Sequence, residues 1–445
     1  MVQIEPHFSY VRSTRGHLKG NITVPGSKSC TIRAVMLGML ADGITTIHNP
    51  LASRDGISAL RAAKLLGATV SADQENHIWT IQGLSGVPKV PDDVIDTLNS
   101  GTTTSFTTGI CTLLTNGYAV ITGDEQIRNR PWRHETDALK ELGATCIHTR
   151  GKNDSPPLVI SGPIHGGKCH LPGFNSQHVS GVLVPAALLP EGESIHIEVA
   201  DPLETPYVQM TIDWMKKFGA EVDVSADYKH YCIKGGQSYH ACNCTIPSDW
   251  SSVAFPLVAA VCTPSEVVIS GVKFDDVQGD KIVVDLLLEM GADIEKDTDQ
   301  GKLIIHGGKP LHGITIDMNA IPDSLPALSV AAAYAQGTTH FTNLAHVRVK
   351  ETDRVAVIQE NLTACGGKVD ITESTMTVYG GRPLHGTIVN GHHDHRIVMA
   401  MTILGLLADG MMQVDDPECA EVSFPGFYTL MNQLDAGFEL LEGED

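Results

Sequence analysis

The sequence predicts an α/β protein in which six similar units form two domains of three units each. The length of 445 residues exceeds that of one ordinary domain. A hydrophobic content of 42% beside a charged content of 19% supplies enough apolar side chains for extensive cores. Two sequence patterns, repeated in alternation along the chain, define the units.

The first pattern is an amphipathic helix that ends at a glycine and leads into a β-like stretch. Its apolar positions recur at helical spacing, and its glycine stands where a helix C-cap needs a left-handed conformation. Successive glycines are roughly 75 residues apart, a regular spacing that indicates an internal repeat. The clear copies cover residues 59–70, 138–147, 211–222, 283–294 and 357–369, with a degenerate copy near Gly437.

The second pattern is a more apolar helix with a polar start, and it lies between copies of the first. These helices are apolar nearly all round, so we expect them to be buried and wrapped by the amphipathic helices and sheets. Any α/β protein carries helices at intervals, but two interleaved patterns with one period make chance spacing a poor explanation. The chain should cross between the domains near residues 243–250. The copies cover residues 27–43, 99–117, 175–192, 249–265, 321–337 and 394–410.

Composition argues against several classes of protein. The 31 basic and 52 acidic residues give a net charge of −21, whereas nucleic-acid binding rests on a cationic surface. The N-terminal residues show no secretory signal, and no apolar stretch is long enough to span a membrane. The ten cysteines form no regular framework and are expected to be free thiols. We therefore expect a cytoplasmic protein.

The polar starts of the buried helices carry most of the residues capable of chemistry. Helix N-termini present unsatisfied N–H groups and a partial positive charge, which suit phosphates and carboxylates. If both domains direct these ends at one cleft, the cleft attracts anions although the exterior is acidic. Closure of the domains on their substrates would then exclude water.

Several segments resemble, in order and spacing, the 5-enolpyruvylshikimate-3-phosphate synthase family. The most specific are VRVKETDR at residues 347–354 with DHR at residues 394–396, and PGSKS at residues 25–29 adds to them. The resemblance runs from about residue 15 to about residue 430. It implies the enolpyruvyl transferase fold, an inside-out α/β barrel of two domains with three βαβαββ units each. We expect one domain to consist of residues 1–24 with 247–445, and the other of residues 25–246.

The family reaction joins phosphoenolpyruvate to the 5-hydroxyl of shikimate 3-phosphate, releases phosphate and belongs to aromatic amino acid biosynthesis. Protonation of the enol methylene and attack by the hydroxyl give a tetrahedral intermediate, which then eliminates phosphate. This chemistry needs a base for the hydroxyl, an acid for the methylene and cations for phosphate and carboxylate. The resemblance implies no metal, no organic cofactor and a monomeric enzyme.

The resemblance assigns the catalytic roles to three residues. Asp323 is matched to the base, and Glu351 to a proton donor or shuttle for which Lys28 is the competing candidate. Arginine suits the binding of phosphoenolpyruvate because its planar guanidinium bonds carboxylate and phosphate through two parallel hydrogen bonds. The residues matched to phosphoenolpyruvate are Lys28, Gly101, Arg130, Gln177, Arg354 and Arg396. At Gly101 a larger residue would crowd the phosphate end of that substrate.

The acceptor side is matched to Lys28, Ser29, Arg33, Ser176, Gln177, Tyr207, Asp323 and Lys350. Each functional interpretation has an ordinary structural alternative. Lys28 and Arg33 would be solvated charges at a helix start, although the macrodipole disfavours cations there unless an anion is present. The arginines would be members of surface ion pairs. Asp323 would be the N-cap of a helix beginning at Ser324, a role compatible with catalysis.

Five positions depart from the family pattern. Ser105 replaces an arginine, and Val422 replaces a lysine that closes on phosphoenolpyruvate. Asn175 and Glu204 replace two of three serines around the phosphate of the acceptor, and His346 replaces an asparagine. A glutamate facing a phosphate is repulsive. The donor half of the site is therefore mostly kept, whereas the acceptor half is altered.

Three functions remain open on this evidence. The first is a divergent shikimate-pathway synthase in which His346 or Arg133 supplies compensating charge. The second is the same carboxyvinyl transfer to a different hydroxyl, and the third is a non-catalytic descendant, against which the retained catalytic set argues. Relatives that act on UDP-N-acetylglucosamine carry a reactive cysteine near the position of Glu125, so that activity is not expected.

A metal hydrolase is the remaining alternative. His392, His393, Asp394 and His395 form a run of possible ligands, and His240, Cys242 and Cys244 lie close together in sequence. Neither group has a zinc-binding spacing with a second ligand pair. We therefore expect no metal site.

Overall fold

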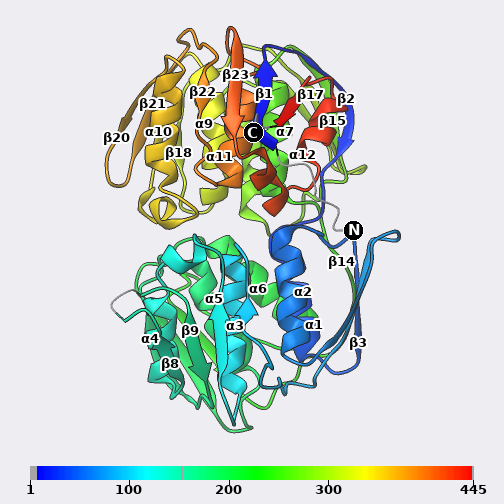
Figure 1. The fold of residues 1–445 in the computed structure, drawn as a ribbon, viewed down its shortest axis with the longest axis vertical. Coiled ribbons are helices and arrows are strands. Elements are labelled where there is room, and N and C mark those ends of the chain that lie inside the picture. Colours follow the sequence, from blue (N-terminus) through cyan, green and yellow to red (C-terminus); the bar gives the residue numbers. More distant parts are fainter. Residues whose placement is uncertain (1–7, 152–153, 443–445) are drawn as a thin grey trace. The chain divides into compact units, whose positions relative to one another are not determined.

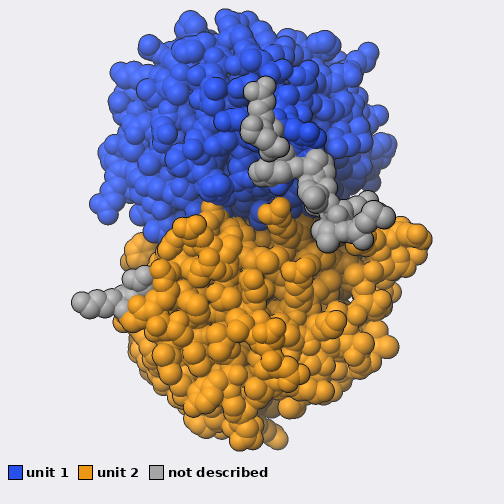
Figure 2. Space-filling view, viewed as in Figure 1, with its two compact units in different colours: residues 1–25, 248–445 blue, residues 26–247 orange. Residues whose placement is uncertain are grey.

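The computed structural model describes residues 8–151 and 154–442, and the chain forms two compact units (Figure 2). Residues 1–25 and 248–445 make unit 1, and residues 26–247 make unit 2. The chain passes between the units twice, and a backbone hydrogen bond within one unit lies beside each passage. The Ser27 N–H donates to the Pro247 carbonyl at 2.7 Å within unit 2, and the Asp249 N–H donates to the Pro25 carbonyl at 3.0 Å within unit 1.

Each unit contains three four-stranded sheets built to one plan (Figure 1). In the strand orders given in the next paragraph, the first two strands of every sheet are parallel to each other. All other neighbouring strands are antiparallel. One buried and one outer helix accompany each sheet, which confirms the repeated βαβαββ unit. The six sheets stay separate, and none within the described ranges closes into a barrel.

The strands follow these spatial orders. In unit 2 the sheets are β14 (Asn243–Thr245), β3 (Ile44–His48), β5 (Ile78–Gln82), β4 (Thr69–Asp73); β6 (Ile95–Asp96), β7 (Ala119–Thr122), β9 (Leu158–Ser161), β8 (Thr145–His148); and β10 (Gly167–Leu171), β11 (Ser194–Val199), β13 (His230–Lys234), β12 (Asp223–Val224). In unit 1 they are β2 (Leu18–Thr23), β15 (Ser265–Ser270), β17 (Lys302–His306), β16 (Ile294–Asp297); β18 (Thr315–Asp317), β19 (Gly337–Thr342), β21 (Met376–Gly380), β20 (Lys368–Ile371); and β22 (Ile388–Val389), β23 (Met411–Asp415), β1 (Phe8–Thr14), β24 (Glu439–Glu442).

The helices fall into two classes, as the two sequence patterns predict. The inner helices are α1 (Lys28–Leu40), α3 (Gly101–Ile110), α5 (Ser176–Ala186), α7 (Trp250–Cys262), α9 (Leu325–Tyr334) and α11 (His395–Leu404). The outer helices are α2 (Arg54–Leu65), α4 (Arg133–Glu141), α6 (Thr205–Lys217), α8 (Val283–Glu289), α10 (Arg354–Ala364) and α12 (Phe427–Asn432). Six short 3-10 helices are η1 (Cys111–Leu113), η2 (Ile127–Asn129), η3 (Gly279–Ile282), η4 (Pro322–Ser324), η5 (Ala345–Val349) and η6 (Pro417–Val422).

Burial of the inner helices matches the expectation. Every residue of α3 and of α7 is buried, and α7, α9 and α11 pack against one another in unit 1. The α3 helix departs from an apolar pattern, because it is rich in threonine. Thr104 shows how a buried hydroxyl is satisfied there: its Oγ1 donates to the Ser100 carbonyl at 2.8 Å.

The glycines of the first pattern adopt the predicted left-handed conformation. Their φ angles run from +67° at Gly437 to +106° at Gly67, so the degenerate copy obeys the same rule as the clear ones. Within the described ranges, no helix is long and apolar enough to cross a membrane.

The inner helices α3 and α5 approach each other closely at two glycines. A Cβ atom built on Gly109 would lie 1.8 Å from the Gly181 carbonyl oxygen, a backbone atom that cannot move aside alone. The absence of a side chain at Gly109 therefore allows the last turn of α3 to approach the middle of α5.

Gly109→Ala should lower the free energy of unfolding by about 1–3 kcal/mol, because the added methyl forces α3 and α5 apart. Urea unfolding measures the loss. Gly167→Ala is the matched control: it stands on an exposed strand, and the nearest atom to its added methyl is the Leu142 Cδ2 at 3.8 Å. Equal stability of the two variants would contradict this account of the α3–α5 contact.

Candidate active site

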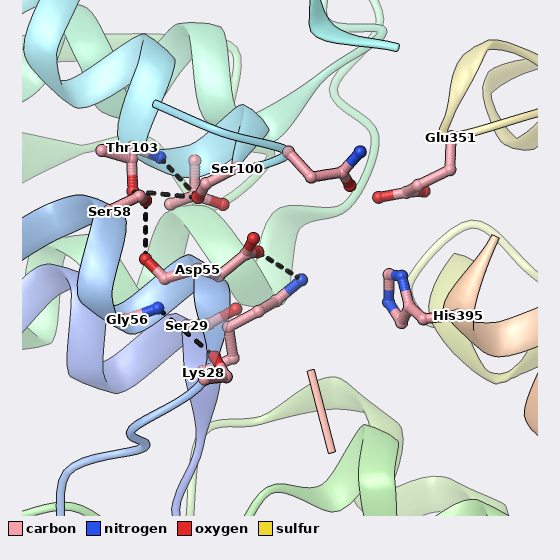
Figure 3. Close-up of polar contacts among 12 residues, drawn as sticks. Lys28, Ser29, Asp55, Gly56, Ser58, Ser100, Thr103, Glu351 and His395 are labelled. Atoms are coloured by element: carbon pink, nitrogen blue, oxygen red, sulfur yellow. Dashed lines mark hydrogen bonds and ion pairs between the residues drawn. The ribbon is translucent and has the colours of Figure 1, made fainter. Parts of the chain in front are cut away.

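The start of α1 holds Lys28 in a buried ion pair. Ser27 caps the helix, and the Lys28 side chain is only 11% exposed. Its Nζ lies 3.2 Å from the Asp55 Oδ2 in the first turn of α2, and the Asp55 side chain is 4% exposed (Figure 3). The alternative of a solvated cation at the helix start is therefore wrong for Lys28. The anion beside it in this structure is an internal carboxylate.

A chain of hydroxyl groups joins this ion pair to α3 (Figure 3). Ser58 Oγ donates to the Asp55 carbonyl at 2.7 Å and lies 3.0 Å from Thr103 Oγ1. Ser100 is the N-cap of α3, and its Oγ donates to the same Thr103 Oγ1 at 2.9 Å. Sequence reasoning missed Asp55. The available signal was an acidic residue in the first turn of an otherwise amphipathic helix, but such residues are common at exposed helix starts.

Gly101, Arg130 and Gln177, here called the Gly101 cluster, come together in unit 2. A Cβ atom on Gly101 would lie 2.9 Å from both the Arg130 Nη1 and the Gln177 Oε1, so these side-chain ends converge over the bare α3 start. Arg130 is the C-cap residue directly after the 3-10 helix η2, and Gln177 Nε2 donates to Thr102 Oγ1 at 3.1 Å. The structure thus unites three of the residues that the resemblance matches to phosphoenolpyruvate.

Arg33 is a buried cation with neutral partners. Its Nε donates to Thr211 Oγ1 at 2.8 Å, and its two terminal nitrogens donate to the Ser29 and Tyr207 carbonyls at 2.9 Å each. Burial lowers the pKa of Arg33 to about 10, so the guanidinium remains charged at neutral pH. In the described part of the chain no carboxylate forms an ion pair with it. A buried charge without a counter-ion favours an anionic ligand.

The start of α5 is already occupied by a carboxylate. Asn175 caps the helix by accepting the Gln177 N–H at 3.0 Å. Glu204 is 2% exposed and accepts hydrogen bonds from the Ser176 hydroxyl at 2.7 Å and from the Ser176 N–H at 3.2 Å. Glu204 therefore points toward this helix start. Arg133, one proposed source of compensating charge, pairs instead with Asp154 near the surface.

Unit 1 contains the Arg354 cluster, formed by Asp323, Glu351, Arg354, Asp394 and Arg396. The Arg354 side chain is 0% exposed and binds three carboxylates. Its Nε lies 2.7 Å from the Asp394 Oδ2, its Nη1 3.0 Å from the Asp323 Oδ1 and its Nη2 2.6 Å from the Glu351 Oε2. Burial alone would lower the pKa of Arg354, but the charges of Asp394, Glu351 and Asp323 raise it well above its ordinary value.

Asp323 also bridges the second arginine of this cluster. Its Oδ2 lies 3.0 Å from Arg396 Nη2, which in turn donates to Ser251 Oγ at 3.0 Å. The expectation that Asp323 caps a helix is wrong, because it lies inside η4 and the capping position before α9 belongs to Ser324. Both arginines are buried, so their interpretation as surface ion pairs is also wrong.

The remaining predicted positions lie elsewhere in unit 1. Lys350 directly follows η5 and is half-buried, and His346 within η5 is 1% exposed. Val422 in η6 is 5% exposed, so it packs in the core of this unit.

The histidine run beside Arg396 is divided among separate partners. His393 Nδ1 lies 2.6 Å from Asp416 Oδ2, His392 Nε2 lies 3.4 Å from Glu360 Oε2, and His395 Nε2 lies 2.9 Å from Arg396 Nη1. Across residues 8–151 and 154–442, no three side chains of His, Cys, Asp or Glu gather as metal ligands.

Arg354→Leu should lower the free energy of unfolding by about 3–5 kcal/mol at neutral pH, because it leaves a buried carboxylate without its counter-ion. The loss should shrink near pH ~4, where carboxylates begin to take up protons. Urea unfolding at the two pH values measures both effects. Arg15→Leu is the control: its pair with Asp409 is 69% and 70% exposed, and its removal should cost about 0–1 kcal/mol. Comparable losses in both variants would contradict a stabilising role of the buried pairs.

Comparison with known proteins places this site in a family. The family model of EPSP synthase (3-phosphoshikimate 1-carboxyvinyltransferase) matches residues 13–431. A 3-phosphoshikimate 1-carboxyvinyltransferase of Ruminiclostridium cellulolyticum is 38% identical over 97% of this chain and 100% of its own length. Another from Acetivibrio thermocellus is 39% identical over 95% and 97%, respectively.

Solved structures agree with the sequence relatives. The EPSP synthase of Acinetobacter baumannii superposes with a TM-score of 0.80 at 30% identity, covering 97% of this chain and 99% of its own. The enolpyruvyl transferase NikO of Streptomyces tendae has a TM-score of 0.79 at 18% identity over 99% and 100%, a likeness of fold alone. The predicted enolpyruvyl transferase fold is therefore confirmed, and the chain belongs to the EPSP synthase (3-phosphoshikimate 1-carboxyvinyltransferase) family.

Proposed function

We propose that the chain transfers the enolpyruvyl group of phosphoenolpyruvate to the 5-hydroxyl of shikimate 3-phosphate and releases phosphate. The observation that carries this proposal is the assembly, within each unit, of matched residues that are far apart in sequence. The Gly101 cluster joins positions 101, 130 and 177, and the Arg354 cluster joins positions 323, 351, 354, 394 and 396. The names of the relatives in Ruminiclostridium and Acetivibrio support the same reaction.

The proposed roles follow the chemistry of each group. Arg130, Arg354, Arg396 and Lys28 bind phosphoenolpyruvate, with Gly101 and Gln177 shaping its site. Asp323 accepts the proton of the acceptor hydroxyl, and Glu351 with Lys28 delivers a proton to the enol methylene. Ser29, Arg33, Ser176, Tyr207 and Lys350 contact the acceptor together with Lys28, Gln177 and Asp323.

Substrate binding on this proposal is an exchange of anions. Asp323 lies 3.0 Å from both Arg354 and Arg396. A carboxylate or phosphate of phosphoenolpyruvate takes over these two guanidinium groups and releases the Asp323 carboxylate. The released carboxylate can then accept the proton of the acceptor hydroxyl.

We further infer that units 1 and 2 are the two domains of a monomeric cytoplasmic enzyme and that they act on the substrates together. The buried cation Arg33 supports an anionic acceptor. Growth of an auxotroph that lacks the shikimate-pathway synthase, once supplied with this chain, tests the whole proposal.

One observation favours a second candidate, the same transfer to a hydroxyl acceptor without a phosphate at this place. The Glu204 carboxylate occupies both donors of Ser176 at the start of α5. A phosphate placed there would have to displace Glu204 or lie beside a like charge. The two candidates therefore differ in what Glu204 does when the acceptor binds.

Asp323→Ala should lower kcat by about a hundredfold to ten-thousandfold, as loss of a general base does. Binding of phosphoenolpyruvate should persist or tighten, because the variant frees Arg354 and Arg396 from an internal anion. Steady-state kinetics and calorimetric titration measure the two effects. Asp317→Ala, on the exposed end of β18, is the control and should leave kcat unchanged. Wild-type turnover in the Asp323 variant would refute the assignment of the base.

Glu204→Ser separates the two acceptors. If shikimate 3-phosphate is the substrate and Glu204 moves aside, the wild type binds it and the substitution changes its Kd little. If the acceptor lacks this phosphate, the wild type binds shikimate 3-phosphate poorly, and Glu204→Ser should improve binding by about tenfold, which corresponds to about 1.4 kcal/mol. Calorimetric titration with and without phosphoenolpyruvate decides; no binding in either condition would defeat the preferred acceptor.

A further inference from the structure

A carboxyl group without a role in the proposed chemistry is buried where α3, α4 and α5 meet. Glu135 lies in the first turn of α4 and is 0% exposed. A Cβ atom on Gly181 would lie 2.3 Å from Glu135 Oε1 and 2.9 Å from the Ser105 carbonyl oxygen. The carboxyl therefore lies directly against the backbone of α5, at the contact between α5 and α3.

The surroundings of this carboxyl are polar but uncharged. The Ser105 hydroxyl and the Trp132 indole N–H face it, yet neither carboxyl oxygen makes a hydrogen bond of normal geometry with the described residues.

Among the described residues, no cation forms an ion pair with Glu135, although several titratable groups lie around it. Cys146 faces it from β8, and burial raises the pKa of that thiol to about 12. His178 approaches from α5, with its ring 5.9 Å from that of Trp132, and His134 of α4 lies 6.4 Å from His178. On the outer side of α4 are Asp137 and Lys140, which pair with each other at 3.0 Å.

An ionised carboxylate in this environment is strongly disfavoured. Moving an isolated charge out of water without a counter-ion costs several kcal/mol or more, and a buried group avoids this cost by staying neutral. Burial raises the pKa of Glu135 well above its ordinary value, and the opposing influence of Ser105 and Trp132 does not offset it.

The three helices that meet at this carboxyl also carry the Gly101 cluster. Gly101 begins α3, Gln177 lies in the first turn of α5, and Arg130 precedes α4 by three residues. We propose that Glu135 is a positioning residue that, as a neutral carboxylic acid, allows α3, α4 and α5 to pack together and so keeps the Gly101 cluster in place, and that its ionisation in alkali weakens binding of phosphoenolpyruvate. The second half of the proposal rests on the proposed function.

Stability as a function of pH tests the protonation state. A raised pKa in the folded protein means that the stabilising contribution is complete below the unfolded pKa and is lost as pH rises through the folded value. Glu135→Gln keeps the shape of the neutral acid and cannot ionise. Between about pH 6 and about pH 9, the urea midpoint of the wild type should therefore fall relative to that of Glu135→Gln. Glu221→Gln, at an exposed position of the same unit, should follow the wild type. Parallel curves for all three proteins would overturn the proposal.

Ligand binding tests the positioning role separately. Between about pH 6 and about pH 9, the Kd of the wild type for phosphoenolpyruvate should rise by about tenfold more than that of Glu135→Gln. The Glu221→Gln control should again follow the wild type, which removes titration of the substrate and of shared side chains from the comparison. Equal pH profiles of wild type and Glu135→Gln would overturn the positioning role even if the stability test succeeds. Absence of binding at every pH would overturn the proposed function and the positioning role together, while the stability test still decides the protonation state.

Two further measurements test the proposal if Glu135→Gln does not fold. Glu135→Leu also cannot ionise and should show the same flattened stability profile. In the wild type itself, the infrared carbonyl band of a protonated carboxylic acid should persist at about pH 8, far above the ordinary range of a glutamic acid. Its absence from the spectrum would overturn the proposal.

Discussion

Burial of the inner helices is the constraint on which the remaining structure depends. A helix leaves its first N–H groups without partners inside the helix, and a buried start cannot leave them to water. Side chains therefore cap five of the six inner helices: Ser27, Ser100, Asn175, Asp249 and Asp394. Polar residues are thus required at these starts by folding alone, and the same segments provide the charged residues of the proposed site.

The two fully buried arginines show two ways of keeping a cation inside a protein. Arg354 forms ion pairs with three carboxylates of unit 1, which compensate its buried charge. Arg33 is held by a hydroxyl and two carbonyls, whose dipoles lower the cost of burial without cancelling the charge. An external anion that binds Arg354 has to displace an internal carboxylate. For Arg33, no carboxylate of the described residues has to be displaced.

Internal carboxylates recur beside the groups proposed to bind substrate. Asp55 accompanies Lys28, Asp323 accompanies Arg354 and Arg396, and Glu204 takes the donors of Ser176. Binding of an anion to such a site replaces one charge-assisted contact by another, so the net affinity is the difference between two strong interactions.

The sequence by itself determined the repeat, the two helix classes, the left-handed glycines and the family. These features depend on local periodicity, on capping chemistry and on motifs of consecutive residues, all of which are written along the chain. Only the tertiary structure decided which charges meet. Several of these contacts join segments from 27 to 73 residues apart: Lys28 with Asp55, Asp323 with Arg354 and Arg396, and Glu204 with Ser176. The burial of Glu135 depends on packing between helices. Such contacts depend on the distance and dielectric surroundings created when separate elements pack, and no local sequence pattern encodes either quantity.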